Sequence, residues 1–238
     1  LVSDGIELSV VLPAHNEQDA IEGVIAEVVA TVRELAPGAA EVLVIDDGST
    51  DETGAILDRL AAEHDEVEVI HQRPNRGHGP ALLAGWTRAR GTWVGHLDTD
   101  DQIPVDQLAL LWPERTHADL VLGIRTDRDD PTHRLVVTKV LRALVGRLAG
   151  RPIRDANVPC KLVSASLLAD ALPLLPDDTF APSVGLVVVA ARRGRTIREV
   201  PVVHRARPHG TSSLKPLRLA SGLWTSTRQT VALARSLR

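Results

Sequence analysis

Residues 41–63, EVLVIDDGSTDETGAILDRLAAE, decide the fold class of this chain. An apolar run of strand length, Glu41–Asp46, is followed by polar turn residues, and a helical pattern then covers Glu52–Glu63. Thr50 or Asp51 can cap that helix, because a short oxygen side chain satisfies its free backbone N–H groups. Strand, turn and helix in this order predict one βα unit of a parallel sheet.

The same order of elements continues on both sides of this unit. Three more segments have the pattern of strands and two have the pattern of helices. The strands are Glu7–Pro13, Val67–His71 and Thr92–Leu97, and the helices are Glu17–Leu35 and His78–Ala89. Such alternation is typical of an α/β fold with a Rossmann-like, mostly parallel central sheet flanked by helices. Ligands of these sheets bind beyond the carboxyl ends of the strands.

The second half of the chain is less regular. Strand patterns occur at Leu120–Gly123, Val158–Val163 and Ile197–Val203, and helical patterns at Arg134–Leu148, Leu186–Arg193 and Leu217–Leu237. No composition shift or Pro/Gly-rich stretch marks a linker. We therefore expect a single domain over residues 1–238 that ends in a basic helix at residues 216–238.

Composition places the chain among ordinary globular proteins. Apolar residues make up 44% and charged residues 24% of the chain, which argues against disorder. The only cysteine, Cys160, excludes an internal disulfide and a cysteine-based zinc site, and it favours a reducing compartment. Apolar runs fall far short of the roughly 20 residues that span a bilayer. We expect a cytoplasmic protein, in solution or peripheral at the membrane face.

Charge is unevenly distributed along the chain. Residues 192–238 hold eleven Arg and Lys residues and a single acid, Glu199, whereas the preceding residues carry a net charge of −14. A basic tail on an acidic body indicates an anionic partner, which can be a phosphate, a nucleic acid or a lipid headgroup. The alternative is an ordinary solvated helix surface.

The residues Asp98-Thr99-Asp100-Asp101-Gln102 directly follow an apolar strand. Alternate residues of an extended segment point the same way, so the carboxylates of Asp98 and Asp100 can converge. Two such carboxylates hold a hard cation, Mg²⁺ or Mn²⁺, and leave positions for phosphate oxygens. The cation neutralises charge that develops on a leaving diphosphate. The alternative interpretation is an acidic turn that caps the next helix.

Two more polar clusters follow neighbouring strands. Asp46–Ser49 is either an ordinary turn or a carboxylate site for a base N–H or a ribose hydroxyl. The acids at these two strand ends would repel one another without a metal or hydrogen-bond donors. Pro13–Glu17 ends the first strand, and its alternative interpretation is a helix start with Asn16 as the cap and Glu17 near the helix dipole.

A glycine-containing segment, Asn75–Gly79, opens the helix at His78–Ala89. Its glycines allow the backbone to approach a ligand closely. The segment is not a dinucleotide fingerprint, because Leu82 stands where a third glycine is required and no acid has the expected ribose role. A Rossmann dehydrogenase is therefore disfavoured.

The four clusters, in chain order, resemble the motifs of family 2 glycosyltransferases with the GT-A fold. The matching patterns are P-x-x-N-E at 13–17, D-D-G-S at 46–49, N-x-G-x-G at 75–79 and D-x-D-x-Q at 98–102. The second half is similar to the polyprenol-phosphate (dolichol-phosphate) mannose and glucose synthases, through G-x-R at 123–125 and R-x-x-G-x-S at 207–212. Those enzymes carry an Asp followed by an aromatic and a basic residue where this chain has Asp155, Cys160 and Lys161.

The resemblance implies a metal-dependent, inverting transfer of a hexose from a UDP- or GDP-sugar to a polyprenyl phosphate. It implies a nucleotide-sugar half at residues 1–125 and an acceptor half at 126–215, with no nucleic-acid partner. The implied donor-binding residues are Pro13, His15, Glu17, Asp46, Asp47, Gly77 and Asp98. The implied metal ligands are Asp98, Asp100 and Gln102, and the implied phosphate contacts are Arg125, Lys161, Arg207 and Ser212.

The family's E-D base pair and Q-x-x-R-W acceptor motif are missing, which argues against a processive polysaccharide synthase. A phosphate monoester acceptor is already anionic near neutral pH, with a second pKa of about 6, and needs little help from a base. Asp155 is the candidate base, and capping or ion pairing is its structural alternative. Leu223 and Trp224 of the basic terminal helix can lie in an anionic lipid interface, or the helix simply packs.

Two other functions stay open at this point. One is transfer to a soluble natural-product or nucleotide-type acceptor, which the lack of a membrane-spanning pattern favours. The other is a non-catalytic protein that binds nucleotide sugars, which would show donor binding without turnover.

Overall fold

A central sheet of seven strands organises the computed structural model of the chain, which describes residues 5–100, 102–125, 142–205 and 216–237. The strand order is β3-β2-β1-β4-β6-β5-β7. The strands are β1 Leu8–Ala14, β2 Ala40–Asp46, β3 Val67–His71, β4 Trp93–Leu97, β5 Leu120–Arg125, β6 Cys160–Ser164 and β7 Ile197–Val202. Strands β3, β2, β1 and β4 pair in parallel, β6 runs antiparallel to both β4 and β5, and β7 pairs in parallel with β5. The predicted α/β fold with a mostly parallel sheet is confirmed.

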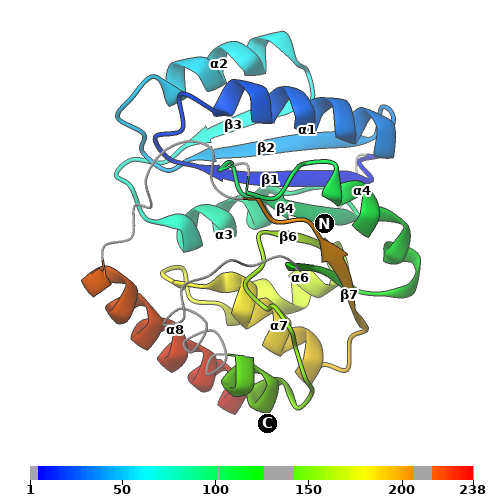
Figure 1. Ribbon diagram of the computed structural model, residues 1–238, viewed down its shortest axis with the longest axis vertical. Helices are drawn as coiled ribbons and strands as arrows, with labels where there is room; N and C mark the ends of the chain where they lie inside the picture. The colour runs from blue at the N-terminus through cyan, green and yellow to red at the C-terminus, as the bar shows by residue number, and fades with distance from the viewer. Residues whose placement is uncertain (1–4, 101, 126–141, 206–215, 238) are drawn as a thin grey trace.

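Helices cover both faces of the sheet (Figure 1). They are α1 Ile21–Leu35, α2 Thr53–Glu63, α3 His78–Arg88, α4 Gln107–Leu111, α6 Ala165–Ala171, α7 Pro182–Arg192 and α8 Pro216–Ser236. Short 3₁₀ helices cover Trp112–His117 and Leu172–Leu174, and residues 142–149 are also helical. Helices α1 and α2 lie on one side of the sheet and α3, α7 and α8 on the other. This arrangement follows from right-handed crossovers, because the chain reverses direction across the sheet after β3.

The core lies where apolar strands meet one stripe of each helix. Every residue of β1 is buried, as expected for a central strand covered on both faces. Helix α1 buries Ile21, Val24, Ile25, Val28, Val29 and Val32, which recur at helical spacing. The buried stripe thus explains why this segment is a helix and which way it faces.

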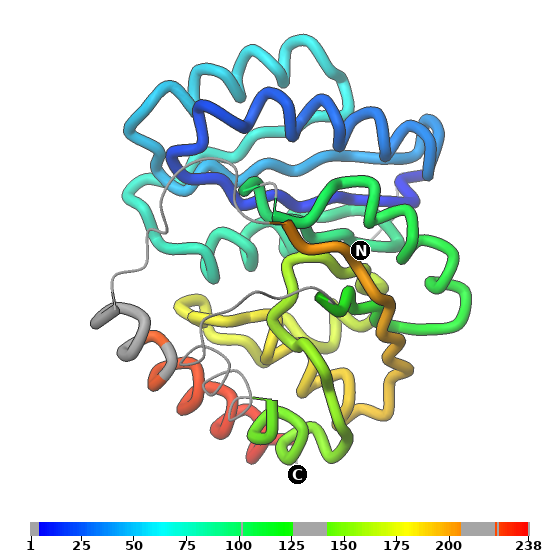
Figure 2. The backbone as a smooth tube through the Cα atoms, viewed as in Figure 1, coloured from blue at the N-terminus to red at the C-terminus, as the bar shows by residue number. Residues whose placement is uncertain are grey.

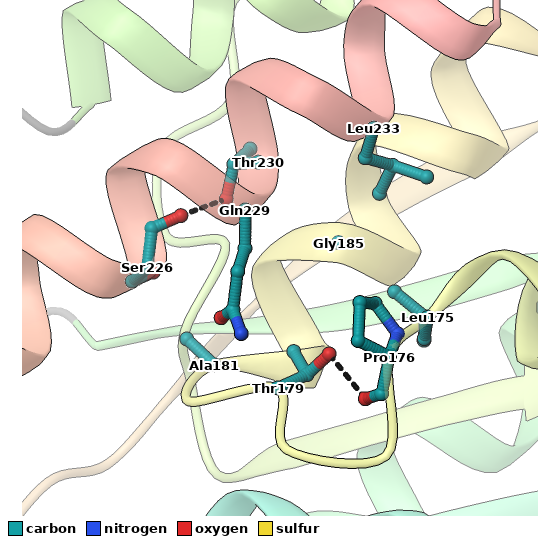
Figure 3. A pocket seen from close by; sticks show the side chains of 9 residues that line it. All are labelled: Leu175, Pro176, Thr179, Ala181, Gly185, Ser226, Gln229, Thr230 and Leu233. Carbon is teal, nitrogen blue, oxygen red and sulfur yellow. Dashed lines mark hydrogen bonds between the residues drawn. The ribbon is translucent and has the colours of Figure 1, made fainter.

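Helix α8 closes the far side of the molecule against α7. The tube view shows the part of this terminal helix drawn in red beside the yellow segments at the start of α7 (Figure 2). Gln229, Thr230 and Leu233 face the loop before α7, and the amide oxygen of Gln229 accepts the N–H of Phe180 at 3.1 Å (Figure 3). The cavity between these helices measures about 10 Å³, the space of roughly one water molecule.

Two predicted helix starts need correction. Helix α1 begins at Ile21 instead of Glu17, so the interpretation of Asn16 as its cap is wrong. Asn16 instead has a φ of 55°, and its side-chain oxygen accepts the N–H of Thr50 at 2.8 Å. At the start of α2, Asp51 is the residue that accepts a helix N–H, from Thr53 at 3.0 Å. Tertiary contact between the two loops therefore replaces the local cap that the sequence predicts at Asn16.

Other boundaries differ by a few residues. Strand β6 begins at Cys160 instead of Val158, and α7 begins at Pro182 instead of Leu186, since proline is well suited to the first turn of a helix. The helix predicted at Arg134–Leu148 lies partly outside the described residues, and its described part is helical.

The close packing of α3 on the sheet gives a stability prediction. A Cβ atom at Gly85 of α3 would overlap a methyl group of the fully buried Val11, whereas a Cβ at Gly23 of α1 would meet nothing within 4 Å. Gly85→Ala should lower the free energy of unfolding by about 1–3 kcal/mol through overpacking. Gly23→Ala should raise it by about 0.5–1 kcal/mol, since alanine favours helix interiors. Urea unfolding of both variants checks this, and equal effects of the two changes would contradict it.

Candidate functional site

The polar clusters meet at one edge of the sheet. Strands β1 and β2 pair so that Ala14 lies opposite Asp46, and β1 and β4 pair so that Val11 lies opposite His96. Because these strands are parallel, their carboxyl ends share one edge, and the loops that follow them are neighbours. The location predicted for a ligand site is therefore the place where the sequence clusters gather.

Asp46 is a buried carboxylate with protein partners. It accepts the backbone N–H of Ser49 at 2.9 Å, and its other oxygen lies 2.8 Å from Nδ1 of His71. Burial alone would raise the pKa of Asp46, but the hydrogen bonds from Ser49 and His71 outweigh it and lower the pKa. Asp46 therefore remains ionised inside the turn.

Asp47 joins the turn after β2 to the start of α3. Its two carboxylate oxygens accept the backbone N–H groups of Arg76 and Gly77, each at 2.7 Å. Gly48 has a φ of 68°, and a Cβ there would lie 2.8 Å from the backbone nitrogen of Asn75, so only glycine allows this approach. The D-D-G-S turn and the N-x-G-x-G loop are thus one interlocked unit. Protein N–H groups, without any metal, satisfy the acids at this strand end.

The loop after β1 joins the same unit. Asn16 accepts the N–H of Thr50 and donates its own N–H to Ser49 Oγ at 3.0 Å. Nδ1 of His15 lies 3.2 Å from the side-chain amide of Asn75. The carbonyl of Pro13 accepts the hydroxyl of Thr99 at 3.2 Å, which ties the loop after β4 to this rim. We call residues 13–17, 46–49 and 75–79 the loop rim.

Asp98 lies beside the loop rim with two imidazole neighbours. Its Oδ1 is 3.1 Å from Nε2 of His96 and 3.8 Å from Nε2 of His78. Burial would raise the pKa of Asp98, but His78 and His96 overcome it and bring this pKa to about 2. Burial lowers the pKa of His96 to about 4, helped by the positive charge of Lys161. At neutral pH an ionised carboxylate therefore faces a neutral His96.

These contacts differ from the predicted metal ligand set of Asp98, Asp100 and Gln102. In the part of the chain that the structure describes, one group of three or more His, Cys, Asp or Glu residues has its donor atoms within 4.8 Å of one another. It is formed by His78, His96 and Asp98. Asp100 is not in that group, and its Oδ1 accepts the backbone N–H of Gln102 at 3.2 Å. Sequence reasoning missed both histidines. The alternation of His96 and Asp98 along β4 was the available signal.

The donor chemistry suits a divalent cation. One carboxylate and two imidazole nitrogens match Mn²⁺ and its heavier neighbours, and the side-chain oxygens of Asp100 and Gln102 follow on the same loop. The predicted ligand set and this group of three residues thus share Asp98. The assignment of Asp100 and Gln102 as ligands stays a prediction.

A second charged cluster lies across β5 and β6. Arg125 forms a two-point ion pair with Asp155, with distances of 2.7 and 3.1 Å. Lys161 is fully buried and donates from Nζ to Ser183 Oγ at 2.5 Å. Burial lowers the pKa of Lys161 to about 7 against the opposing pull of Asp98 and Asp155. Asp155 thus has the ion pair that was its structural alternative, and its role as a base stays a prediction.

Two predicted phosphate contacts, Arg207 and Ser212, lie outside the described residues. Arg125 and Lys161 lie within them, and both are engaged with protein partners. Their predicted contact with phosphate is not tested by these distances.

Fold and site together define the class of the protein. A mostly parallel sheet with an acidic strand-end cluster beside the loop rim is the arrangement of the GT-A glycosyltransferases. The model of the family described as "Glycosyl transferase family 2" matches residues 9–170. The chain belongs to glycosyl transferase family 2.

The curated relatives are named as transferases. An undecaprenyl-phosphate 4-deoxy-4-formamido-L-arabinose transferase of Edwardsiella ictaluri is 29% identical over 215 residues, covering 89% of this chain and 64% of that protein. Glycosyltransferase AglD of Haloferax volcanii is 34% identical over 206 residues, covering 83% and 33% respectively. The chain spans less than two thirds of the length of these relatives.

Solved structures share the fold over nearly the whole chain. Glucosyl-3-phosphoglycerate synthase from Mycobacterium tuberculosis, in complex with Mn²⁺, UDP and phosphoglyceric acid, has a TM-score of 0.67 and 25% identity, covering 98% of this chain and 78% of that one. Mannosyl-3-phosphoglycerate synthase from Rubrobacter xylanophilus has a TM-score of 0.67 and 21% identity, covering 98% and 75%. The GT-A fold predicted from the motifs is confirmed.

His71 gives a pH prediction. Its ring bridges Asp46 and Asp58, and these contacts raise its pKa above the ordinary value. Because the pKa of His71 is higher in the folded state, protonation of its ring stabilises the fold at every pH below the unfolded-state pKa of about 6.5. This stabilisation is lost as the pH rises through the folded-state pKa. His71→Gln should therefore destabilise the protein more at pH 5.5 than at pH 9. Urea unfolding across this range measures it.

The control for this experiment is His117→Gln. His117 is exposed at the end of the 3₁₀ helix over Trp112–His117, remote from the Asp46 turn. Its effect on the free energy of unfolding should not follow the pH profile of His71→Gln. A pH-independent effect of His71→Gln would contradict the charged bridge.

The Arg125–Asp155 pair gives a second stability prediction. The side chains are 15% and 8% exposed, so Asp155→Ala leaves a nearly buried guanidinium without its partner. This change should cost about 3 kcal/mol of unfolding free energy. Arg125→Ala combined with Asp155→Ala should cost less than the sum of the single changes, and a double-mutant cycle measures this coupling. Additive costs would mean that the ion pair does not form.

Proposed function

We propose that this chain is a metal-dependent, inverting glycosyltransferase that moves a hexose from a UDP- or GDP-sugar to a polyprenyl phosphate. The observation that carries the proposal is the interlocked loop rim beside the ionised Asp98. The relatives named undecaprenyl-phosphate transferases match about nine tenths of the chain and support the acceptor class.

The loop rim is the proposed donor site. Protein groups donate hydrogen bonds to Asp46 and Asp47, and each carboxylate oxygen keeps a lone pair for a base N–H or a ribose hydroxyl. Pro13, His15 and Glu17 line the same loops, and Gly77 presents backbone without a side chain at the start of α3. The start of α3 favours the donor's phosphates, because a helix N-terminus carries partial positive charge.

We propose Asp98, Asp100 and Gln102 as the residues that would bind the cation. When bound, a divalent cation neutralises the charge that develops on the departing nucleoside diphosphate. Asp98 is already ionised at neutral pH, so it binds without first releasing a proton. The Mn²⁺ and UDP of the mycobacterial synthase complexes support this cofactor class.

The cluster of Arg125, Asp155 and Lys161 is the proposed acceptor side. An acceptor phosphate is already a nucleophile near neutral pH, since its second pKa is about 6. Asp155 shares both oxygens with Arg125, which suits the positioning of the guanidinium better than proton removal. Lys161 is sealed from solvent, so we propose that it adds positive potential without touching phosphate. Because they match the R-x-x-G-x-S motif of the family, we also assign Arg207 and Ser212 to the acceptor side.

Helix α8 is the proposed membrane-facing element. In the described helices, none is long and apolar enough to cross a bilayer. The side chain of Trp224 is 66% exposed, whereas Leu233 and Ala234 are buried. The helix therefore packs against the protein with one face and exposes another face to solvent. Arg228 and Arg235 are exposed on the same helix. We propose that this outer face contacts anionic lipid at the cytoplasmic membrane face.

A soluble acceptor is the second candidate function. The structures that share the fold include synthases whose complexes hold phosphoglyceric acid, and they cover 98% of this chain. Such an acid carries a phosphate group, so the same charged cluster suits it. Activity in water without lipid or detergent distinguishes this acceptor class. Donor binding without any turnover would instead indicate a nucleotide-sugar-binding protein.

Donor binding is the first test. Calorimetry with UDP-glucose, UDP-N-acetylglucosamine and GDP-mannose, each with Mn²⁺ or with chelator, should show metal-dependent binding of one donor. Asp100→Asn should weaken that binding at least tenfold, about 1.4 kcal/mol, with the fold intact. Asp65→Asn, an exposed change next to the amino end of β3, is the matched control. Binding that chelator and Asp100→Asn leave unchanged would rule out the metal role.

Transfer of the labelled sugar then identifies the acceptor. The chain with its donor is offered undecaprenyl phosphate in detergent, or 3-phosphoglycerate in water. A labelled lipid product supports the main proposal, and a labelled soluble product supports the second candidate. Bound donor with no product on either acceptor counts against both.

A further inference from the structure

Of the two histidines beside Asp98, His96 lies outside the motifs on which the donor site is proposed, and His78 is one of the unspecified positions of the N-x-G-x-G motif. His96 lies on β4 two residues before Asp98, and His78 is the first residue of α3. Both Nε2 atoms approach the same carboxylate oxygen, Oδ1 of Asp98, at 3.1 and 3.8 Å. Three separate positions in the sequence thus converge on one point at the sheet edge.

The spacing of these donor atoms fits a common cation. One nitrogen from each histidine and one oxygen of Asp98 all lie within 4.8 Å of one another. Imidazole nitrogens and carboxylate oxygens bind transition-metal ions at about 2.0–2.2 Å, so donors that share one ion lie about 3–4 Å apart. Small side-chain rotations would bring the three atoms to that spacing.

The site is rigid on one side and open on the other. His96 is fully buried, and the Trp86 ring packs edge-on against it with ring centroids 6.3 Å apart and an interplanar angle of 85°. The His78 side chain is 52% exposed, and Asp98 is 29% exposed. The packing around His96 fixes the orientation of its ring, while the exposed side of the site leaves coordination positions for phosphate oxygens or water.

We propose that His78, His96 and Asp98 form a mixed nitrogen–oxygen site that binds a divalent first-row metal cation, Mn²⁺, Co²⁺ or Zn²⁺, in preference to Mg²⁺. The proposal rests on the proposed function in placing the cation at Asp98, and it goes further in naming two ligands and the metal class. Mg²⁺ takes oxygen ligands and keeps several waters, whereas imidazole suits the later transition metals. Two nitrogens in the set therefore select against Mg²⁺.

A buried basic side chain also acts on this site. Lys161 supplies the nearby positive charge, and it is buried and hydrogen-bonded to Ser183. That charge weakens cation binding and also favours an anionic diphosphate on the cation, so affinity should rise when UDP is present.

Direct metal binding tests the proposal without any activity assay. Protein stripped with chelator is titrated with MnCl₂, CoCl₂ or MgCl₂ in a calorimeter, with and without UDP, and Co²⁺ is also followed by its visible absorption bands. Wild-type protein should bind Mn²⁺ and Co²⁺ at least tenfold more tightly than Mg²⁺. Because His78 is exposed, His78→Gln should fold normally, and it should weaken Co²⁺ and Mn²⁺ binding at least tenfold while changing Mg²⁺ binding less than twofold.

Two further variants keep the test decisive. His96→Asn should also weaken Co²⁺ binding, with circular dichroism and urea unfolding to show that the variant is folded. His117→Gln, an exposed histidine outside the site, should leave all three metals unaffected. Equal wild-type affinity for Mg²⁺ and Mn²⁺, or unchanged Co²⁺ binding and absorption in His78→Gln, would overturn the proposal.

Failure of this inference and failure of the proposed function give different results. If Asp100→Asn abolishes metal binding while His78→Gln does not, the site is made of oxygens alone. The metal-dependent transferase then stands, and the histidine ligands do not. If wild-type protein binds no divalent cation with or without UDP, both proposals fail together.

Discussion

The buried carboxylate of Asp47 is the interaction on which the site depends. It follows β2, yet its two oxygens accept N–H groups from Arg76 and Gly77 at the start of α3. Leaving either N–H or the carboxylate unpaired in this buried position would cost a few kcal/mol each, so the two loops stay together. Gly48 makes the approach sterically feasible, and Asn16 attaches the third loop through Thr50. The Asp47 carboxylate and the Asn16 side chain thus join loops from three separate βα units.

Acidic and basic side chains lie together in the candidate site. Asp98 contacts His96, and Asp155 pairs with Arg125. Both carboxylates favour the cationic form of the buried Lys161. The low dielectric of the interior makes these interactions strong, and it also makes an unpaired member costly. Such an arrangement would suit the proposed cation beside Asp98 and the proposed phosphates beside Arg125.

Much of the architecture follows from local pattern. The alternation of apolar strands and amphipathic helices predicted β1 to β4 and their helices within a few residues, since burial on both faces of a central strand and on one stripe of a helix leaves a clear periodicity. The start of α1 was predicted wrongly, because Asn16 hydrogen-bonds Thr50 across space instead of capping its own helix. The start of α7 was also missed, because Pro182 precedes the apolar run that marks the helix.

The sequence by itself determined the α/β class, the sheet edge where the site lies and the family, because these depend on periodicity and on motifs whose order is visible along the chain. Only the tertiary structure decided what each acid contacts. It showed that Asp47 binds backbone N–H groups, that Asp155 pairs with Arg125, and that His78 and His96 approach Asp98. These partners are far apart in sequence or lie on opposite sides of a turn, and their distances are set by strand register and helix packing, which no local pattern encodes.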